Sequence, residues 1–282
     1  MLAYRHAFHA GNHGDVLKHL TLMLVLRHMA LKDKGFRFVD THAGAGGYSL
    51  QSTYALKKAE HANGISKLWG RDDLPQFVAD YVALVRAFNG KKKAVLEQYP
   101  GSPAIAQALL RTQDQLRLFE LHPTDHRVLQ SYLGHEKGAE IFMTDGFESP
   151  KSQLPPSTRR AVVLIDPSYE VERDYARVVG MLREAVLRFP EGTYIVWYPQ
   201  VGRLAAVELP KKLQNLSPKG WLHARLTVQK PDARGFGMAG SGVFVINPPH
   251  TLHAQLAEVL PWLHQELKQF DGGGWLLDQR AA

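Results

Sequence analysis

The feature that most constrains this chain is a regular alternation of short apolar runs with segments of helical apolar spacing. Continuous apolar runs rich in Val, Ile and Phe are typical of strands buried on both faces of a sheet. Strands that alternate with helices predict a mostly parallel α/β sheet covered on both faces. We expect seven strands, at 36–40, 116–120, 139–143, 161–165, 193–197, 223–229 and 242–247. We expect the main helices at 14–33, 46–50, 103–113, 124–134, 173–189, 203–216 and 252–269.

Two connections depart from this alternation. The last two predicted strands are separated only by KPDARGFGMAGSG, which has no helical pattern, so we expect an antiparallel hairpin there. Between Asp40 and Leu116 the chain is much longer than the crossover of about a dozen residues that two parallel strands need. The surplus contains LPQFVADYVALVRAF, whose apolar residues recur at helical spacing. We therefore expect a small helical subdomain at 52–101, inserted into a domain formed by 1–51 and 102–282.

Composition narrows the class of protein. The 282 residues include 34 Lys and Arg against 27 Asp and Glu, a net charge of +7 that favours a polyanionic partner such as nucleic acid. The run Lys91, Lys92 and Lys93 is one candidate contact, and a solvated face is the alternative interpretation. The absence of cysteine excludes disulfides, thiolate nucleophiles and Cys-based zinc sites. The start of the chain is too polar for a signal peptide and no apolar run reaches membrane-spanning length, so we expect a cytoplasmic protein with no membrane partner.

Three successive predicted strands end in an acidic residue. Asp40 is followed by the turn AGAG, Glu120 ends LRLFE, and Asp145 lies in MTDGF after the third strand. The dinucleotide fingerprint would need a glycine where Ser49 stands, whereas an acid before such a turn is typical of S-adenosylmethionine pockets. We expect the amides of a following helix to face the ligand. At the shared edge of the sheet, Glu120 is expected to accept hydrogen bonds from ribose hydroxyls and Asp145 from an adenine amino group, while Gly146 leaves room for the purine.

The next predicted strand, AVVLI, runs directly into Asp166, Pro167, Ser168 and Tyr169. An exocyclic amine on a nucleobase is a poor nucleophile because its lone pair is delocalised into the ring. The Asp166 carboxylate and the Pro167 carbonyl can hold the two amine hydrogens and orient the lone pair toward a methyl sulfonium. The ring of Tyr169 can stack on the base, which must first be flipped out of any helix. The set therefore indicates methylation of an amino group on a planar base.

Three further segments contain residues that could take part in catalysis, metal binding or cofactor binding. NPPH at 247–250 also looks like an amino-methylation motif, but it follows an antiparallel strand and therefore lies at the wrong edge; we interpret it as structural. The first 19 residues hold four histidines with few carboxylates nearby, so we expect no metal site. We instead expect the tail and helix of 1–34 to cover the cofactor, with Lys18 and His19 meeting its methionine carboxylate. In YPGSP, Ser102 is expected to cap the following helix.

The segments YRHAFHAGNHGDVLKH, DTHAGAGGY, YPGSP, ELHP, DGF and IDPSYE together resemble the RlmJ family of 23S ribosomal RNA adenine-N6 methyltransferases, over essentially the whole chain. The resemblance implies a monomeric, metal-free, Rossmann-like class I methyltransferase that uses S-adenosylmethionine and acts on 23S ribosomal RNA. It implies cofactor contacts at His19, His42, Ser102, Glu120, Asp145 and Gly146, catalysis by Asp166, and approach of Tyr4 to the substrate base. We also expect Lys18 and Asp166 among the cofactor contacts, and His6, Pro167 and Tyr169 among the substrate contacts.

One residue departs from the family pattern, which has Asp-Pro-Pro-Tyr where this chain has Ser168 as the third residue. The Pro167 carbonyl is retained, so we expect a less rigid loop and an affected rate with unchanged chemistry. Two other functions stay open. One is a DNA adenine methyltransferase, or a protein linked, as family members have been, to the use of external DNA. The other is a nucleic-acid-binding protein without catalysis. Binding of S-adenosylmethionine, and methyl transfer to RNA compared with DNA, separate these possibilities.

Overall fold

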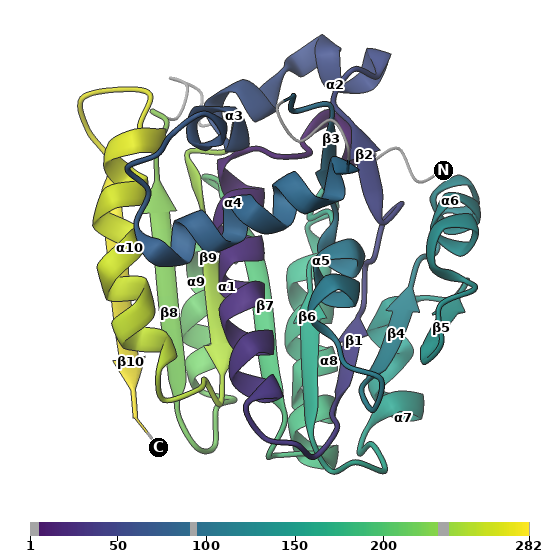
Figure 1. Ribbon diagram of the computed structural model, residues 1–282. Helices are drawn as coiled ribbons and strands as arrows, with labels where there is room; N and C mark the ends of the chain where they lie inside the picture. Colours follow the sequence, from purple (N-terminus) through teal and green to yellow (C-terminus); the bar gives the residue numbers. More distant parts are fainter. Residues whose placement is uncertain (1–5, 91–94, 231–236, 282) are drawn as a thin grey trace.

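The computed structural model describes residues 6–90, 95–230 and 237–281, which form a central sheet with helices on both faces (Figure 1). The sheet has eight strands in the order β10-β8-β9-β7-β6-β1-β4-β5. The strands from β7 to β5 are parallel, and each neighbouring pair from β7 outward to β10 is antiparallel. The strand bounds are β1 (Arg37–Asp40), β4 (Gln115–Phe119), β5 (Ala139–Phe142), β6 (Ala161–Ile165), β7 (Thr193–Gln200), β8 (Trp221–Thr227), β9 (Gly240–Ile246) and β10 (Gly274–Arg280).

The predicted fold class is confirmed, because the chain forms a Rossmann-like α/β fold with a mostly parallel sheet. All seven predicted strands are present close to their predicted bounds, and β6 is buried along its whole length. β8 and β9 form the predicted antiparallel hairpin. The predicted number of strands is wrong, because β10 adds an eighth. This edge strand is mostly exposed or half-buried, so its sequence contains no continuous apolar run of the kind that marks the buried strands.

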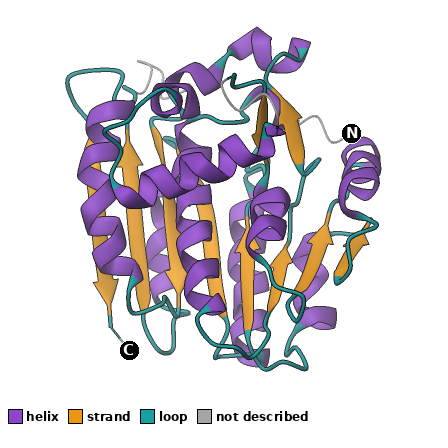
Figure 2. Cartoon of the chain, viewed as in Figure 1, coloured by secondary structure: helices purple, strands orange, loops and turns teal. Residues whose placement is uncertain are grey.

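Helices form one layer on each side of the sheet, as the secondary-structure colours of Figure 2 make clear. In the view of Figure 1, α1, α4, α5 and α10 lie in front of the sheet, while α8 and α9 lie behind it. Each layer packs its own hydrophobic cluster against the sheet. Every residue of α1 from 13 to 26 is buried, so this helix is enclosed on all sides. The bounds are α1 (His13–Ala30), α4 (Gln76–Phe88), α5 (Ser102–Leu109), α6 (Pro123–Leu133), α7 (Ser149–Gln153), α8 (Arg173–Arg188), α9 (Leu204–Gln214) and α10 (Leu252–Leu267).

The segment 52–101 lies between the turn after β1 and helix α5. Its apolar spacing predicts a helix, and α4 confirms this by burying Val78, Tyr81, Val82 and Val85. The helix predicted at 46–50 is wrong, because the chain there forms the short strand β2 (Gly47–Ser49), which pairs with β3. The helix that follows β1 in the layer is therefore α5. The smaller elements are α2 (Thr53–Lys58), η2 (Glu60–Asn63), α3 (Ile65–Trp69) and β3 (Gln98–Pro100).

The subdomain boundaries at 52 and 101 stay a prediction. Tyr81 and Val82 of α4 belong to the same hydrophobic cluster as Leu17 and Leu20 of α1, so the inserted segment packs into the main core. None of the helices in the described ranges is both long enough and apolar enough to cross a membrane. The same ranges contain no group of three or more His, Cys, Asp or Glu side chains arranged to hold a metal ion.

Candidate active site

A pocket lies at the carboxyl-terminal edge of the parallel strands, where β1, β4, β5 and β6 end. The segments that follow these four strands supply most of its wall, and α1, α5 and α8 supply much of the rest, together with His6, Tyr48 and Asp125. Its charged lining residues are Lys18, Glu120, Asp125, Asp145, Asp166, Asp174 and Arg177. The pocket is therefore lined by five carboxylates and two cationic groups, although the chain as a whole carries a charge of +7. Such a pocket favours a small cationic ligand, while the rest of the chain favours a polyanion.

Glu120 follows β4 and lines the pocket, as the sequence predicts. Its two carboxylate oxygens accept hydrogen bonds from the backbone amides of Gly44, at 2.8 Å, and His122, at 2.6 Å. Burial raises the pKa of Glu120, and these two amides oppose that rise. The Gly-rich turn is thus attached to the end of β4 through this carboxylate, and each oxygen retains a lone pair for a ligand.

Asp145 and Gly146 also line the pocket. Asp145 accepts a hydrogen bond from the amide of Phe147, at 3.1 Å, at the start of η4 (Gly146–Glu148), and it forms an ion pair with Arg177. The guanidinium of Arg177 also lies over the ring of Phe147, 4.0 Å from its centroid. A Cβ on Gly146 would lie 1.7 Å from the Thr41 carbonyl oxygen. Glycine is therefore required at position 146 because the backbone after β1 comes so close. The sequence predicts that Gly146 leaves room for a purine, but this contact alone already explains the glycine.

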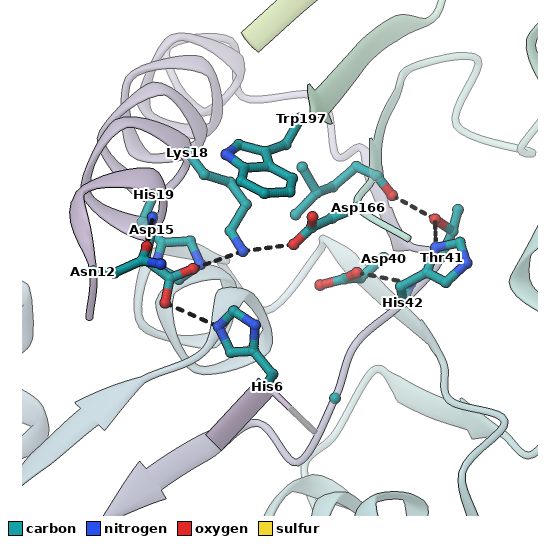
Figure 3. Close-up of polar contacts among 12 residues, drawn as sticks. His6, Asn12, Asp15, Lys18, His19, Asp40, Thr41, His42, Asp166 and Trp197 are labelled. Carbon is teal, nitrogen blue, oxygen red and sulfur yellow. Dashed lines mark hydrogen bonds and ion pairs between the residues drawn. The ribbon is translucent and has the colours of Figure 1, made fainter. Parts of the chain in front are cut away.

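Asp166 belongs to a buried group of charges that reaches from β6 to the N-terminal segment (Figure 3). The Lys18 ammonium lies 2.5 Å from Asp166 Oδ2 and 2.8 Å from Asp15 Oδ1. Asp15 Oδ2 lies 2.9 Å from His6 Nε2, and it also accepts the Gly11 amide hydrogen at 2.9 Å. Lys18 was expected to meet the methionine carboxylate, but here it is shared between two protein carboxylates.

Burial and these ion pairs act in opposite directions on the charged groups. Burial alone would lower the pKa of Lys18, but Asp15 and Asp166 raise it above its usual range. Burial alone would raise the pKa of Asp15, but His6 and Lys18 hold it well below its usual range. Lys18 therefore stays protonated and Asp15 ionised at neutral pH.

Asp40, at the end of β1, is fully buried beside this group. Burial raises its pKa to about 7, while hydrogen bonds from the Ser102 hydroxyl and the His42 amide oppose the rise. The N-cap of α5 is Gly101, and Ser102 is the first residue of the helix. The prediction that Ser102 caps this helix is therefore wrong by one residue. His42 lines the pocket with its ring edge-to-face against Phe147, and burial lowers its pKa to about 4.

The structure does not bring every predicted residue into the pocket. His6, Lys18, His19, His42, Ser102, Glu120, Asp145, Gly146, Asp166 and Pro167 line it. Tyr169 does not: the residue is 3% exposed, its ring lies 4.6 Å from the ring of Tyr175, and its hydroxyl donates to the Trp197 carbonyl at 2.8 Å. Its φ of +54° turns it away from the extended path of β6. Tyr4 and the run Lys91, Lys92 and Lys93 lie outside the described residues.

The motif at Asn247 has a structural role at the opposite edge of the sheet. Asn247 follows β9, which runs antiparallel to β7, and its side-chain amide donates to the carbonyls of Pro190 and Gly192, both at 2.7 Å. Arg160 also lies at that edge, where its guanidinium donates to the carbonyls of Met29 and Lys34.

Sequence reasoning missed Asp15, Asp174 and Arg177. The spacing of three between Asp15 and Lys18 on a helix is a signal that could have identified Asp15. Nothing in the local sequence links Arg177 of α8 to Asp145, which is 32 residues earlier in the chain.

Comparison with known proteins gives consistent matches. The family model described as ribosomal RNA large subunit methyltransferase D, RlmJ, matches residues 33–280. A Haemophilus influenzae protein named ribosomal RNA large subunit methyltransferase J is 44% identical over 278 residues, which cover 99% of this chain and 98% of the relative. The Escherichia coli protein of the same name is 45% identical over 267 residues, covering 95% and 94%. The crystal structure of a Legionella pneumophila protein has a TM-score of 0.87 at 32% identity, covering 96% of this chain and 98% of that one.

Proposed function

Since the chain belongs to the RlmJ family of ribosomal RNA large subunit methyltransferases, we propose that it methylates the N6 amine of a specific adenine in 23S ribosomal RNA. Methylation of ribosomal RNA with S-adenosylmethionine as the donor follows from the family. The 23S adenine and its N6 position are the finer part of the proposal. The observation that carries the N6 amine is the Asp166–Pro167 pair at the wall of an acidic pocket, which offers two acceptors to an amino group. The 23S RNA rests on the resemblance to the family. We also propose that the protein acts as a cytoplasmic monomer.

The residues of the pocket fit S-adenosylmethionine, which carries a sulfonium and an ammonium group. Its two cationic groups suit the excess of carboxylates, and the buried Nε2 of His19, which has no partner among the described residues, suits an acceptor such as its own carboxylate. Glu120 would accept from the ribose hydroxyls, and Asp145 from the adenine amine. His42, Ser102 and Gly146 would complete the site. When bound, S-adenosylmethionine supplies an activated methyl group on a positively charged sulfur.

Asp166 would act on the substrate amine by accepting one of its hydrogen bonds. The amine nitrogen gains positive charge as the methyl group arrives, and a carboxylate fixed beside it stabilises that charge. The ion pair with Lys18 supports this role because it holds the Asp166 side chain in one orientation. The proton would leave the nitrogen after methylation, when that nitrogen is strongly acidic.

The substrate base would be flipped out of its RNA helix to reach these groups. The Pro167 carbonyl would accept the second amine hydrogen, and His6 and Tyr4 of the N-terminal segment would contact the base. Stacking by Tyr169 would require its ring to leave its present contact with Tyr175. A different aromatic or apolar side chain would otherwise have to support the base.

The proposal is tested with 23S ribosomal RNA from a strain that lacks the gene. The protein and S-adenosylmethionine are added to the RNA, and the nucleosides are analysed by mass spectrometry. We expect one additional N6-methyladenosine per RNA, and we expect DNA of the same sequence to remain unmodified. Equal methylation of the DNA would support the DNA methyltransferase alternative instead, and a product methylated on another atom would refute the assignment of N6.

A further inference from the structure

A buried chain of hydrogen bonds connects the inserted segment to the wall of the pocket. The hydroxyls of Tyr81, on α4, and Tyr99, on β3, are 2.6 Å apart. The Tyr99 hydroxyl lies 2.8 Å from Nδ1 of His19, on α1. All three side chains are at most 1% exposed. Among the residues that the structure describes, the Tyr81 hydroxyl has Tyr99 as its sole hydrogen-bond partner, and Nε2 of His19 has no partner.

The number of available hydrogens decides which group donates and which accepts in the hydrogen bonds between Tyr81, Tyr99 and His19. Each tyrosine hydroxyl carries one hydrogen, and a neutral imidazole carries one N–H. If Nδ1 of His19 were the protonated nitrogen, it would donate to Tyr99, and Tyr99 would donate to Tyr81. The hydrogen of Tyr81 would then have no acceptor in a fully buried position, and Nε2 would also be unsatisfied. A buried donor without an acceptor is costly and rare.

The opposite direction uses both tyrosine hydrogens. Tyr81 donates to Tyr99, and Tyr99 donates to the unprotonated Nδ1 of His19. The single N–H of His19 is then on Nε2. Of the three hydrogen-bonded side chains, this N–H is the one donor that has no acceptor. It belongs to a residue that lines the pocket, where a ligand can supply the acceptor. Burial and the nearby Lys18 also hold the pKa of His19 well below its usual range, so the ring is neutral.

We infer that Tyr81 and Tyr99 fix His19 as the neutral tautomer protonated on Nε2, so that this part of the pocket presents a hydrogen-bond donor to an anionic or carbonyl oxygen of the ligand. The identity of that ligand, the carboxylate of S-adenosylmethionine, rests on the proposed function, but the tautomer does not. Tyr81 and Tyr99 are positioning residues, because they act on the ligand through His19. The inserted segment thereby helps to define the cofactor site.

The tautomer can be read directly from protein labelled with ¹⁵N in its histidines. Long-range ¹H–¹⁵N correlation spectra distinguish the two neutral tautomers and the protonated ring, and the His19 signals are identified by their loss in His19→Gln. We expect a protonated Nε2 and an unprotonated Nδ1 at neutral pH. A hydrogen on Nδ1, or on both nitrogens, overturns the inference. This result does not depend on any variant of the tyrosines folding correctly.

Tyrosine variants test whether the chain sets the tautomer. Tyr99→Phe removes the donor to Nδ1, so we expect mixed tautomers and about three- to tenfold weaker binding of S-adenosylmethionine by calorimetry. Tyr81→Phe removes just the outer donor, and we expect the same tautomer preference in weaker form with about a twofold loss of affinity. Tyr194→Phe is the matched control, because Tyr194 is equally buried but donates to the carbonyls of Ala185 and Phe189.

The outcomes separate this inference from the proposed function. An unchanged His19 spectrum and unchanged affinity in a folded Tyr99→Phe variant overturn the positioning role. A change of the same size in Tyr194→Phe also overturns it, because the effect would then reflect general loss of packing. A wild-type protein with the expected tautomer that binds no S-adenosylmethionine supports the tautomer assignment and refutes the cofactor in the proposed function.

Discussion

Replacing Asp166 with asparagine removes one charge from the group of Asp15, Lys18 and Asp166 while keeping an oxygen acceptor at the same position. The Asp166 side chain is 13% exposed and lies 2.5 Å from the Lys18 ammonium, so its orientation is well defined. We expect the single-turnover rate of methyl transfer to fall by roughly 10²-fold or more, as for the loss of one well-placed electrostatic group. Affinity for S-adenosylmethionine should change little, because in the proposed function the main action of this carboxylate is on the base.

The same replacement should have a moderate effect on stability. Removal of one partner from a buried ion pair typically costs about 3–5 kcal/mol, because the other charge is left uncompensated. Here Lys18 keeps Asp15 at 2.8 Å, and asparagine still offers an oxygen to the ammonium. We therefore expect the free energy of unfolding to fall by about 1–3 kcal/mol. Since natural domains are typically stable by about 5–15 kcal/mol, we expect a variant with this loss to remain folded at room temperature and to be suitable for assay.

The assay combines single-turnover methylation with calorimetric titration of S-adenosylmethionine and urea unfolding. Asp278→Asn is the matched control, since it removes the same charge from an exposed position on β10 and should leave all three quantities unchanged. A folded Asp166→Asn variant with nearly wild-type turnover would refute the proposed role of Asp166. An equal loss of rate in Asp278→Asn would show that net charge, and not position, is responsible.

Three further predictions concern the cofactor, the pH dependence and the RNA. Glu120→Ala should weaken binding of S-adenosylmethionine by about 1–3 kcal/mol in calorimetry, because the ribose would lose a charged acceptor; unchanged affinity in a folded variant removes Glu120 from the cofactor site. The pKa of Asp40 is raised on folding from 3.8 to about 7, so its contribution to stability is full below about pH 4 and is lost as the pH rises to about 7. Relative to Asp40→Asn, the wild type should therefore lose up to about 4 kcal/mol of unfolding free energy over this range, and parallel curves for the two proteins in urea unfolding would contradict this. Neutralising Lys91, Lys92 and Lys93 together should raise the KM for RNA and flatten its salt dependence without changing cofactor affinity, whereas an identical salt slope would identify the run as a solvated face.

The parallel part of the sheet and its line of acids were predictable from sequence for one physical reason. β1, β4, β6 and β7 are short, mostly apolar runs that are largely buried, and the acids follow strands of this parallel group where the backbone reaches the edge of the sheet. β5 is a half-buried edge strand, but its run of Ala, Ile and Phe is still apolar enough to be predicted. Glu120, Asp145 and Asp166 could therefore be assigned to one pocket before any contact was known. β10 escaped prediction because an exposed edge strand needs no such run.

The interactions among site residues were much less predictable, because they join distant parts of the chain. Lys18 and Asp166 are 148 residues apart, and His19 and Tyr99 are 80 apart. The sequence pattern places these residues on particular elements but does not give the orientation of their side chains. It therefore predicts Lys18 near the cofactor without showing that its ammonium is held by two carboxylates. For the same reason it predicts Tyr169 near Asp166 without showing that the ring packs into the core.

The complete enclosure of α1 has a consequence for biosynthesis. This helix packs against β7, β9 and α10, which are synthesised more than 150 residues after it. At about 5–20 residues per second, the many apolar side chains of this helix must wait on the order of ten seconds or more for the surfaces that enclose them. During that interval we expect its exposed apolar surface to bind chaperones or to start aggregation.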